Sequence, residues 1–413
     1  MNTSLFIARK IINSGKGTKS NANFFIKIAS AGTSLSIAVM ILTIFVSSGF
    51  KHNIHDKIKI FSSDFQIINY DANQSYDYTP ILIDSNNINK INQLKDVKSS
   101  NAFITKPAIL KYENLIEGIV LKAYQNKETE LFSKILIDGN IPETDSNEVV
   151  ISELLSKKLN IKIHDPILIY FIQDPIRYRK LYVSGIFKSD IYEFDKTFAF
   201  TDIKLLKKIY GWQEGEASGY EITTISNQSP KTQETIEKIL QPKYFSHNEH
   251  VINSNTKVLS SKDRYPQFYF WLDLFDTNVL VIIGLMLAVA SFNLISTLLI
   301  IILEKATLVG LLKAFGGFDS SIRQVFLYVA SYLTFKGLLW GNLLALSIAA
   351  LQYFFKVLPL DAENYYISFV PIYFDWFSLI VLNLISILII LSILIIPSQY
   401  IARISPIKVI RFN

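Results

Sequence analysis

The chain contains no cysteine, and only 18% of its 413 residues carry a charge. The lack of cysteine excludes disulfide frameworks, thiolate nucleophiles, iron–sulfur clusters and cysteine-based zinc sites. Half of the residues are hydrophobic, and the mean hydropathy is +0.29. These averages are too apolar for a typical soluble protein and too polar for a pure membrane bundle. They therefore conceal regions of different composition.

Four long windows are nearly free of charge. They cover residues 28–50, 277–303, 324–355 and 376–402, and Lys336 is the one charge inside them. Because about 20 helical residues cross a ~30 Å hydrocarbon core, the sequence predicts four membrane-spanning helices rather than buried core helices. The first window is long and has no A-x-A site in the right place, so we do not expect a cleaved signal peptide.

Basic residues in the short flanking segments predict the orientation of the chain. Residues 1–27 hold five Lys or Arg and no acid, and the tail after residue 402 holds three and no acid. The segment between the second and third windows is also basic, whereas the segment between the third and fourth is acidic. We therefore expect a multi-pass protein with both termini in the cytoplasm.

The long stretch between the first two windows should then lie outside the cytoplasm. Residues 49–276 hold 28 Lys or Arg and 30 Asp or Glu, so the net charge of +6 resides on the cytoplasmic flanks. This distribution indicates membrane topology and not nucleic-acid binding. The expected fold class is an α-helical membrane protein of four transmembrane helices, with a large α/β extracytoplasmic domain between helices 1 and 2.

Within this domain, β-branched or aromatic runs alternate with segments of helical spacing. This pattern predicts small α/β sandwiches, in two subdomains. The expected strands are Asp64–Asn69, Ala102–Leu110, Leu115–Ala123, Pro166–Phe171, Lys180–Phe187 and Tyr220–Ile225, and the expected helices are Glu153–Leu159, Asp202–Tyr210 and Thr232–Leu240.

The sequence offers little for catalysis. His52 with His55 and His247 with His250 have a spacing that two metal ligands on a helix can have, but no third ligand is near, and solvated polar residues explain them better. In the stretch 15–18, Gly-Lys-Gly-Thr, a glycine separates Lys from Thr, so it is not a phosphate-binding loop. No G-x-S-x-G or H-E-x-x-H motif occurs. We therefore expect a chain that is not an enzyme, with no catalytic residue, metal or bound cofactor.

The second window ends in a short amphipathic segment. Its apolar residues Leu308, Leu311, Leu312 and Phe315 have helical spacing, and the glycine pair at 316–317 should end the helix, because glycine readily takes the left-handed conformation found there. By itself, such a segment is typical of an interfacial helix at a membrane face.

Together with other motifs, this segment resembles the FtsX-like permease family of ABC transporters, and within it the lipoprotein-releasing LolC/LolE type. The resemblance covers nearly the whole chain, and the patterns at 304–317 and 397–411 are the most specific. The matching stretches are Phe6–Lys10, Ser48–Lys51, Glu148–Ile161, Glu304–Gly317, Leu360–Ile367 with Val370 and Pro371, and Pro397–Arg411.

The resemblance implies a MacB/FtsX-like topology and the job of a permease in the bacterial inner membrane. Such a chain pairs with a second permease copy or a paralogue and with ABC ATPase subunits, which use the ATP and magnesium. A cytoplasmic coupling helix would dock on the ATPase, with Leu311, Leu312 and Phe315 as anchors and Lys313 as a polar contact. The implied coupling residues are Glu304, Lys305, Leu308, Leu311, Leu312, Lys313, Phe315, Gly316 and Gly317.

For the lipoprotein-releasing type, the resemblance further implies a triacylated lipoprotein substrate and contact with membrane lipids. The acyl chains would enter a cavity between spans 1 and 2 of the paired permeases. We chose the candidate lining residues by geometry, and lipid-facing or helix-packing roles remain open for each. They are Val39, Thr43, Val46, Phe50, Leu280, Ile283 and Leu287.

The windows and the resemblance together give the expected organisation of the chain. The N-terminal segment and the tail are expected to be cytoplasmic and the loop before span 4 periplasmic. The segments are an amphipathic N-terminal segment 1–27, spans 28–50, 277–303, 324–355 and 376–398, a periplasmic domain 51–272, a coupling helix 304–318, a loop 356–375 and a tail 399–413.

Two features depart from the family pattern. Relatives that recruit a periplasmic carrier use an extended hairpin loop, and the corresponding stretch here, Gln173–Arg179, is short. A role for a carrier therefore stays open. The second feature is Lys336, because a charge within a span is a candidate functional residue, although a lysine can also extend to the interface. Gly337 and Gly341 follow it in a GxxxG pattern that permits close helix packing.

Other functions remain possible at this level. A permease-like transducer could regulate a cell-wall hydrolase without moving a substrate, and an exporter could move peptides or small amphiphiles. A membrane sensor is a different class, and the sequence shows no kinase or cyclase module inside. All except the sensor require a bound ATPase.

Overall fold

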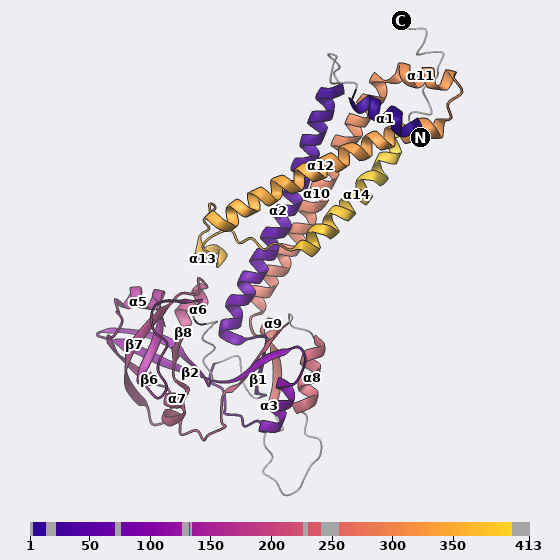
Figure 1. The fold of residues 1–413 in the computed structure, drawn as a ribbon. Coiled ribbons are helices and arrows are strands. Elements are labelled where there is room, and N and C mark those ends of the chain that lie inside the picture. The colour runs from indigo at the N-terminus through magenta and orange to yellow at the C-terminus, as the bar shows by residue number, and fades with distance from the viewer. Residues whose placement is uncertain are drawn as a thin grey trace. The chain divides into compact units, whose positions relative to one another are not determined.

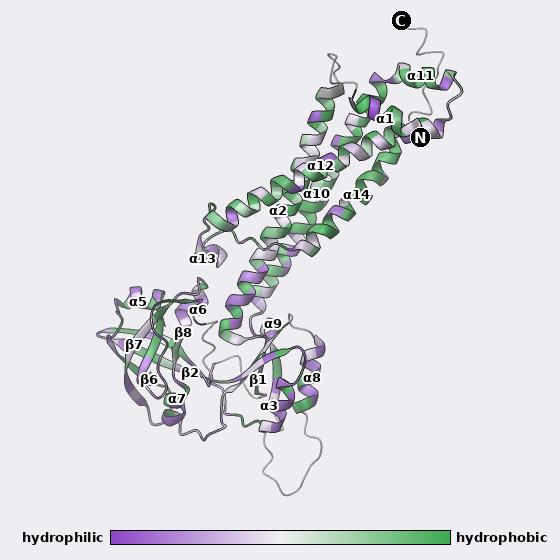
Figure 2. Ribbon diagram, viewed as in Figure 1, coloured by the Kyte–Doolittle hydropathy of each residue, from purple (hydrophilic) through white to green (hydrophobic). Residues whose placement is uncertain are grey.

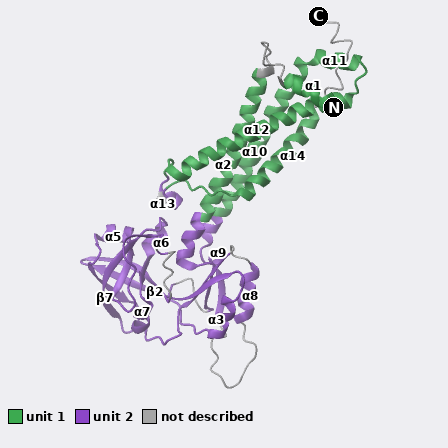
Figure 3. Cartoon of the chain, viewed as in Figure 1, with its two compact units in different colours: residues 1–52, 272–359, 369–413 green, residues 53–271, 360–368 purple. Residues whose placement is uncertain are grey.

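The structure is a computed structural model. The chain divides into two compact units, each of which holds more than one stretch of the sequence (Figure 3). Unit 1 comprises residues 1–52, 272–359 and 369–413, and unit 2 comprises residues 53–271 and 360–368. The residues that the structure describes are 3–13, 22–70, 76–125, 132, 134–225, 230–240 and 256–398.

Unit 1 is helical and strongly apolar (Figures 1 and 2). Among the described residues, four helices are long and apolar enough to cross a membrane: α2, α10, α12 and α14. Each charge-poor window falls on one of them, which confirms the prediction of four apolar helices. The bounds are α1 Thr3–Asn13, α2 Ala22–Ser62, α10 Pro266–Glu304, α11 Ala306–Ala314, α12 Asp319–Phe355 and α14 Trp376–Ser398.

Helices α2 and α10 are longer than the windows that predicted them. Helix α2 continues to Ser62 because no glycine or proline interrupts residues 51–62, and it stops where Ser63 takes a φ of 49°. Its 41 residues make a rod roughly 60 Å long. Helix α10 begins with Pro266, a residue that the first helical position tolerates because the N–H there needs no partner within the helix.

Small residues let α2 and α12 approach closely. A Cβ atom added to Gly341 would lie 2.8 Å from the backbone oxygen of Ser34, and one added to Gly337 would lie 2.8 Å from Thr33 Cγ2. Ile37, Ala345 and Ala349 are buried in the same apolar cluster. The GxxxG pattern therefore lies at a real helix–helix contact, as its sequence allowed.

Unit 2 contains one ten-stranded sheet. Its strand order is β10-β1-β9-β2-β3-β8-β5-β7-β4, and β6 pairs with both β2 and β7. The strands are β1 Phe65–Asn69, β2 Val97–Tyr112, β3 Leu115–Tyr124, β4 Leu136–Gly139, β5 Glu148–Ser152, β6 Pro166–Phe171, β7 Arg177–Phe187, β8 Phe198–Thr201, β9 Gly219–Thr224 and β10 Thr256–Ser260, and the helices are α3 Ser85–Asn92, α5 Glu153–Leu159, α6 Tyr192–Thr197, α7 Ile203–Tyr210, α8 Pro230–Leu240, α9 Ser261–Arg264 and α13 Ala362–Tyr365.

Strand β2 joins two halves of this sheet. Its first half pairs with β9 and its second half with β6, while β3 lies along its other edge. Since β6 also pairs with β7, strands β2, β3, β8, β5, β7 and β6 form a closed circuit. The expected sandwich was therefore wrong for this half, which is a small barrel. Alternating hydrophobicity predicts strands but does not show which strands pair.

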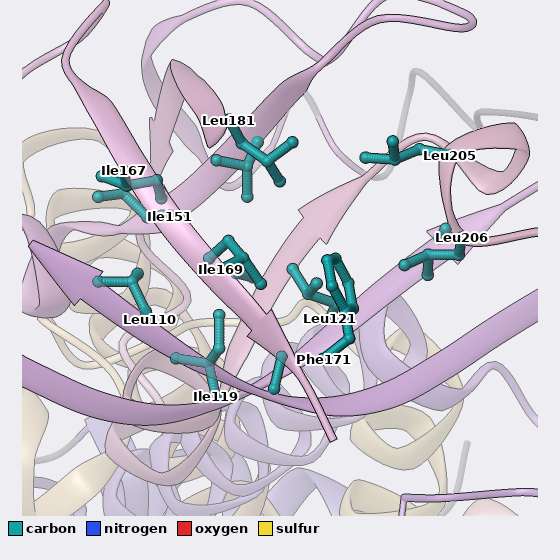
Figure 4. Close-up of a cluster of buried hydrophobic side chains, with 14 of the residues drawn as sticks. Leu110, Ile119, Leu121, Ile151, Ile167, Ile169, Phe171, Leu181, Leu205 and Leu206 are labelled. Carbon is teal, nitrogen blue, oxygen red and sulfur yellow. The ribbon is translucent and has the colours of Figure 1, made fainter. Parts of the chain in front are cut away.

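The barrel is filled by aliphatic side chains that point toward one another (Figure 4). A second cluster packs helices α3 and α8 against β1, β9 and β10. Two cores thus exist on one sheet, in agreement with two subdomains. Members of the first cluster include Leu110, Ile119, Leu121, Ile151, Ile169, Phe171 and Leu181, and members of the second include Phe65, Ile67, Ile91, Ile222, Ile236 and Val258.

The predicted strands and helices of this domain are all present. Pro166–Phe171 and Glu153–Leu159 match β6 and α5 residue for residue. Asp202 lies just before α7 as its N-cap, where its side chain accepts a hydrogen bond from the Lys204 N–H. The expected strands did not include β4, β5, β8 or β10, which are four or five residues long, so a periodicity is harder to recognise in them than in the longer strands.

A buried ion pair fixes the last turn of α2 to the sheet. Lys122 on β3 and Glu221 on β9 are 1% and 2% exposed, and their charged atoms lie 2.6 Å apart. Lys122 Nζ also donates to the backbone oxygen of Phe61 in α2, and Gln66 donates to the carboxylate at 2.7 Å. Burial lowers the pKa of Lys122 and raises the pKa of Glu221, and each partner opposes the shift of the other.

Replacing Lys122 by Met should destabilise the chain by about 3–5 kcal/mol, because Glu221 would remain buried without its counter-charge. The double variant Lys122→Met/Glu221→Leu should recover much of that loss. The measurement is denaturant unfolding of the full chain in detergent, followed by circular dichroism. Lys157→Met, which breaks the exposed pair with Glu153, is the control and should cost no more than about 1 kcal/mol. Equal losses for the two single variants would contradict this account.

Gly341→Ala should destabilise unit 1, since the added methyl group meets a backbone atom that cannot move by itself. Overpacking of this kind costs about 1–3 kcal/mol. Gly284→Ala on α10 is the matched control, because nothing lies within 4 Å of its added Cβ and alanine stabilises a helix by roughly 0.5–1 kcal/mol. Thermal unfolding in detergent should therefore shift in opposite directions for the two variants. A shift of the same sign and size would show that the α2–α12 contact is not tight.

Candidate functional site

Helix α11 is a short helix with a glycine cap. Lys305 precedes it, and Phe315 ends it. Gly316 takes a φ of 83°, and the N–H groups of Gly316 and Gly317 donate to the carbonyl groups of Lys313 and Leu312 at 3.0 and 2.9 Å. This pair of bonds satisfies the last carbonyl groups of the helix. The prediction that the glycine pair ends the helix is confirmed.

The two faces of α11 have different surroundings. Val309 is fully buried, and Leu308 and Leu312 pack against the cluster that joins α1, α10, α12 and α14. On the other face, Leu311 is 44% exposed and Phe315 is 86% exposed. This outward face presents large apolar side chains that no other part of the described chain covers.

The structure therefore divides the expected coupling residues into two groups. Leu308 and Leu312 support the helix from within, whereas Leu311 and Phe315 face outward. Phe318, just after the helix and 78% exposed, extends the outward face; the expected set omitted it because it lies beyond the glycine pair. The charged members pair locally, Glu304 with Lys305 at 3.3 Å and Lys313 with Asp319 at 3.0 Å.

The candidate cavity residues do not share one environment. Ile283 and Leu287 of α10 are half-buried and pack against the cluster that holds α2, α12 and α14. Leu280 is 73% exposed. Phe50 is buried and contacts Phe275, with ring centroids 5.2 Å apart. The remaining three candidates on α2, Val39, Thr43 and Val46, are half-buried.

The end of the α2 segment that belongs to unit 1 explains the Ser48–Lys51 motif. A Cβ on Gly49 would lie 2.5 Å from the backbone oxygen of Pro371, so glycine is required for this close approach. Nearby, the Tyr373 N–H donates to the Phe45 carbonyl at 3.1 Å. Lys51 forms an ion pair with Asp276 of α10. The motif therefore holds α2 against both α10 and the segment before α14.

The loop between α12 and α14 is fastened within unit 2 by charged groups. Lys57 Nζ donates to Asp190 Oδ2 at 2.9 Å and to the Tyr366 carbonyl at 3.0 Å. Ser368 Oγ donates to Asp190 Oδ1 at 3.2 Å, and Lys188 lies 3.2 Å from the same carboxylate. Burial alone would raise the pKa of Asp190, but the two lysines more than offset it and hold that pKa below its usual value.

This arrangement gives Tyr366, within the matching stretch Leu360–Ile367, a structural role. The Tyr366 ring packs on Phe268 at 5.3 Å, while Tyr365 is 44% exposed. Sequence reasoning missed Lys57 and Asp190, because nothing in the sequence indicates a pair 133 residues apart.

The histidines of α2 take separate partners. The His52 ring packs on Tyr373 at 4.9 Å, whereas His55 Nδ1 lies 3.0 Å from the Tyr269 hydroxyl and Nε2 lies 3.3 Å from Asp64. Among the described residues, no group of three or more His, Cys, Asp or Glu side chains could hold a metal ion. His247, His250, the stretch 15–18 and the tail 399–413 lie outside the described residues.

The short stretch Gln173–Arg179 lies at the turn of the hairpin formed by β6 and β7. Strands β6 and β7 pair in antiparallel fashion from Pro166 with Tyr182 to Phe171 with Arg177. The intervening residues 172–176 form the whole connection. Ile176 is 72% exposed and Tyr178 is 62% exposed.

Known proteins resemble both the whole chain and its C-terminal part. Residues 280–406 match the family model described as FtsX-like permease C-terminal. The lipoprotein-releasing system transmembrane protein LolE of Haemophilus influenzae is 20% identical, with 99% of each chain covered. LolC of Buchnera aphidicola (subsp. Schizaphis graminum) is 21% identical over 92% of this chain and 91% of the relative. LolC of Neisseria meningitidis serogroup B is 19% identical over 95% of each.

Solved structures were also compared. The extracellular domain of the noncanonic ABC-type transporter YknZ from Gram-positive bacteria has a TM-score of 0.33 and 16% identity, covering 48% of this chain and all of that one. The periplasmic region of MacB from Actinobacillus actinomycetemcomitans has a TM-score of 0.35 and 14% identity, and the match covers 50% of this chain and 92% of that one. The sequence comparisons confirm the resemblance that the motifs indicated: residues 280–406 match the FtsX-like permease C-terminal model, and the chain as a whole is similar to the lipoprotein-releasing LolC/LolE type.

Proposed function

We propose that this chain is the permease subunit of an ABC transporter that extracts lipoproteins from the bacterial inner membrane for outer-membrane targeting. The whole-length similarity to proteins named for a lipoprotein-releasing system supports the substrate. The observation that carries the proposal within this molecule is the outward apolar face of α11. Leu311 on this short helix and Phe315 and Phe318 after it are exposed, whereas Val309 of the helix is buried and Leu308 and Leu312 are partly buried.

In this proposal, α11 is the helix on which the ATPase acts. An apolar helix face that fits a groove is a common mode of protein recognition. Val309, Leu308 and Leu312 join α11 to the ends of α10 and α12 through one buried cluster. Because such a cluster is close-packed and resists compression, a push on α11 would move those helix ends as a body, as in a shear or hinge transition.

The charge pattern supports the orientation. Basic residues flank the N-terminal end of α2 and helix α11 in the sequence, so we place these two segments on the cytoplasmic side. Unit 2 would then lie in the periplasm. Helices α2 and α10 each extend at least 11 residues beyond the predicted windows, and each includes residues of both units.

The lipoprotein's acyl chains would occupy an apolar space between this chain and its partner permease. Helix α10 supplies much exposed apolar surface for it, and each buried CH₂ of an acyl chain contributes about 0.8 kcal/mol. Leu280 is the expected cavity residue whose exposure suits this role best. Other exposed apolar residues on the helix are Val281, Ile282, Leu285, Val289 and Phe292.

The remaining subunits of the proposed transporter would be other protein chains. ATP and magnesium would be bound by the ATPase subunits, and this chain would bind no cofactor of its own. Whether the second permease is a copy or a paralogue, and whether a periplasmic carrier docks on the short β6–β7 hairpin, would be decided by what co-purifies with the chain.

Phe315→Asp and Leu311→Asp should abolish co-purification of the ATPase, because each would place a charge in an apolar docking groove. A loss of one anchor residue at such a site costs roughly 2 kcal/mol or more, which is at least a 30-fold weaker association. The measurement is a pull-down of the tagged full chain in mild detergent, with mass spectrometry of the bound proteins.

The conservative variants Phe315→Leu and Leu311→Met are the matched controls and should retain the ATPase. Ser320→Asp adds a charge at an exposed position that lies after the outward face, and it should also retain the ATPase. Undiminished ATPase recovery with both Asp variants would remove α11 as the coupling helix. Recovery of cell-wall hydrolases in place of acylated lipoproteins would favour the transducer function and overturn lipoprotein extraction.

A further inference from the structure

Helices α2 and α12 form a groove in which the two charged residues, Lys27 and Lys336, precede the large apolar residues on each helix, with Ser347 as a polar residue among the latter. The groove has a volume of about 620 Å³. On α2 it is lined by Lys27, Ser30 and Ser34, followed by Leu35, and on α12 by Lys336, followed by Trp340 and Ile348. None of its lining residues, all of which the structure describes, is acidic.

Helices α2 and α12 run in the same direction along the groove. Gly337 lies against Thr33, and Gly341 lies against Ser34 and Ile37, so the sequence numbers of α2 and α12 increase together along the groove. Lys27 and Lys336 therefore share one end of it. The apolar side chains lie toward the other end, where Leu35 is 61% exposed and Trp340 is 50% exposed.

The dimensions suit a single lipid chain. From Lys336 to Ile348 the helix rises roughly 18 Å, which is about the depth of one leaflet of a ~30 Å hydrocarbon core. Neither Lys27 nor Lys336 has an acidic partner among the described residues. Two cations at one end of an apolar groove complement an amphiphile, because an amphiphile provides an anion and an apolar chain together.

We propose that this groove binds an anionic phospholipid of the cytoplasmic leaflet. Its phosphate would lie between Lys27 and Lys336, where the hydroxyl groups of Ser30 and Ser34 add polar atoms, and one acyl chain would follow Leu35, Trp340 and Ile348. The leaflet follows from the orientation given under the proposed function, whereas the choice of an anionic lipid does not depend on it. This lipid is distinct from the lipoprotein of the proposed function.

Trp340 makes the groove directly observable. In a full-length variant with Trp212, Trp271 and Trp376 replaced by Phe, Trp340 is the one remaining tryptophan of the four in the chain. This protein is reconstituted alone in phosphatidylcholine vesicles with a small fraction of phosphatidylglycerol that has brominated acyl chains, which quench tryptophan on contact. Brominated phosphatidylcholine at the same fraction gives the reference.

We expect brominated phosphatidylglycerol to quench Trp340 more strongly than the brominated zwitterionic lipid. Each lysine near a membrane surface contributes roughly a fivefold preference for an anionic lipid. Lys336→Met and Lys27→Gln should each remove about that factor, and Lys336→Arg should retain it. Lys356→Met, at the C-terminal end of α12 and outside the groove, is the matched control and should leave the preference unchanged.

Three results would contradict binding of an anionic lipid. Equal quenching by both brominated lipids, or an unchanged preference in Lys336→Met, would show that Lys336 only extends to the interface. Loss of the preference on addition of inorganic phosphate would identify a free anion, and not a lipid, as the ligand. The vesicles contain no ATPase or lipoprotein. A negative quenching result would therefore not affect the proposed extraction function, and failure of that function would not change how the quenching is interpreted.

Discussion

The buried ion pair between Lys122 and Glu221 is the contact on which the anchoring of α2 depends. It joins strands β3 and β9, and the same lysine holds the backbone of Phe61 in the last turn of α2. The ion pair holds the Lys122 ammonium group in place within the sheet, so a helix end that slid along the sheet would lose the buried hydrogen bond to the Phe61 carbonyl. A long helix can transmit movement to a domain only if its end is fixed there, and this pair provides that fixation.

Other contacts within unit 1 and within unit 2 also join helices and loops. Within unit 1, Gly337 and Gly341 bring α12 against α2 at distances that only small residues permit, and one apolar cluster holds α11 to the ends of α10 and α12. Within unit 2, Asp190 and Lys57 fasten the loop that connects α12 to α14. Each of these contacts joins two or more elements, and the proposed coupling would move such joined elements together, as in a shear or hinge transition.

The sequence predicted the elements better than their contacts. The four apolar helices and the glycine end of α11 followed from charge-free windows and a Gly-Gly pair, which are local signals. Closure of the barrel through β6 and the Lys57–Asp190 pair were missed, because they depend on residues far apart in the chain. The two faces of α11 show the same limit: the stripe of Leu308, Leu311, Leu312 and Phe315 was evident, but which of them face outward depends on where α10 and α12 pack.

In the proposed function, this chain couples ATP hydrolysis in its partner subunits to the release of a lipoprotein from the membrane. The most direct test is reconstitution of the chain, its partner permease and the ATPase in proteoliposomes loaded with a triacylated lipoprotein, with release into a soluble acceptor as the measured quantity. The account predicts release that requires ATP hydrolysis and this chain. ATP hydrolysis that depends on the chain but leaves every lipoprotein in the membrane would contradict it.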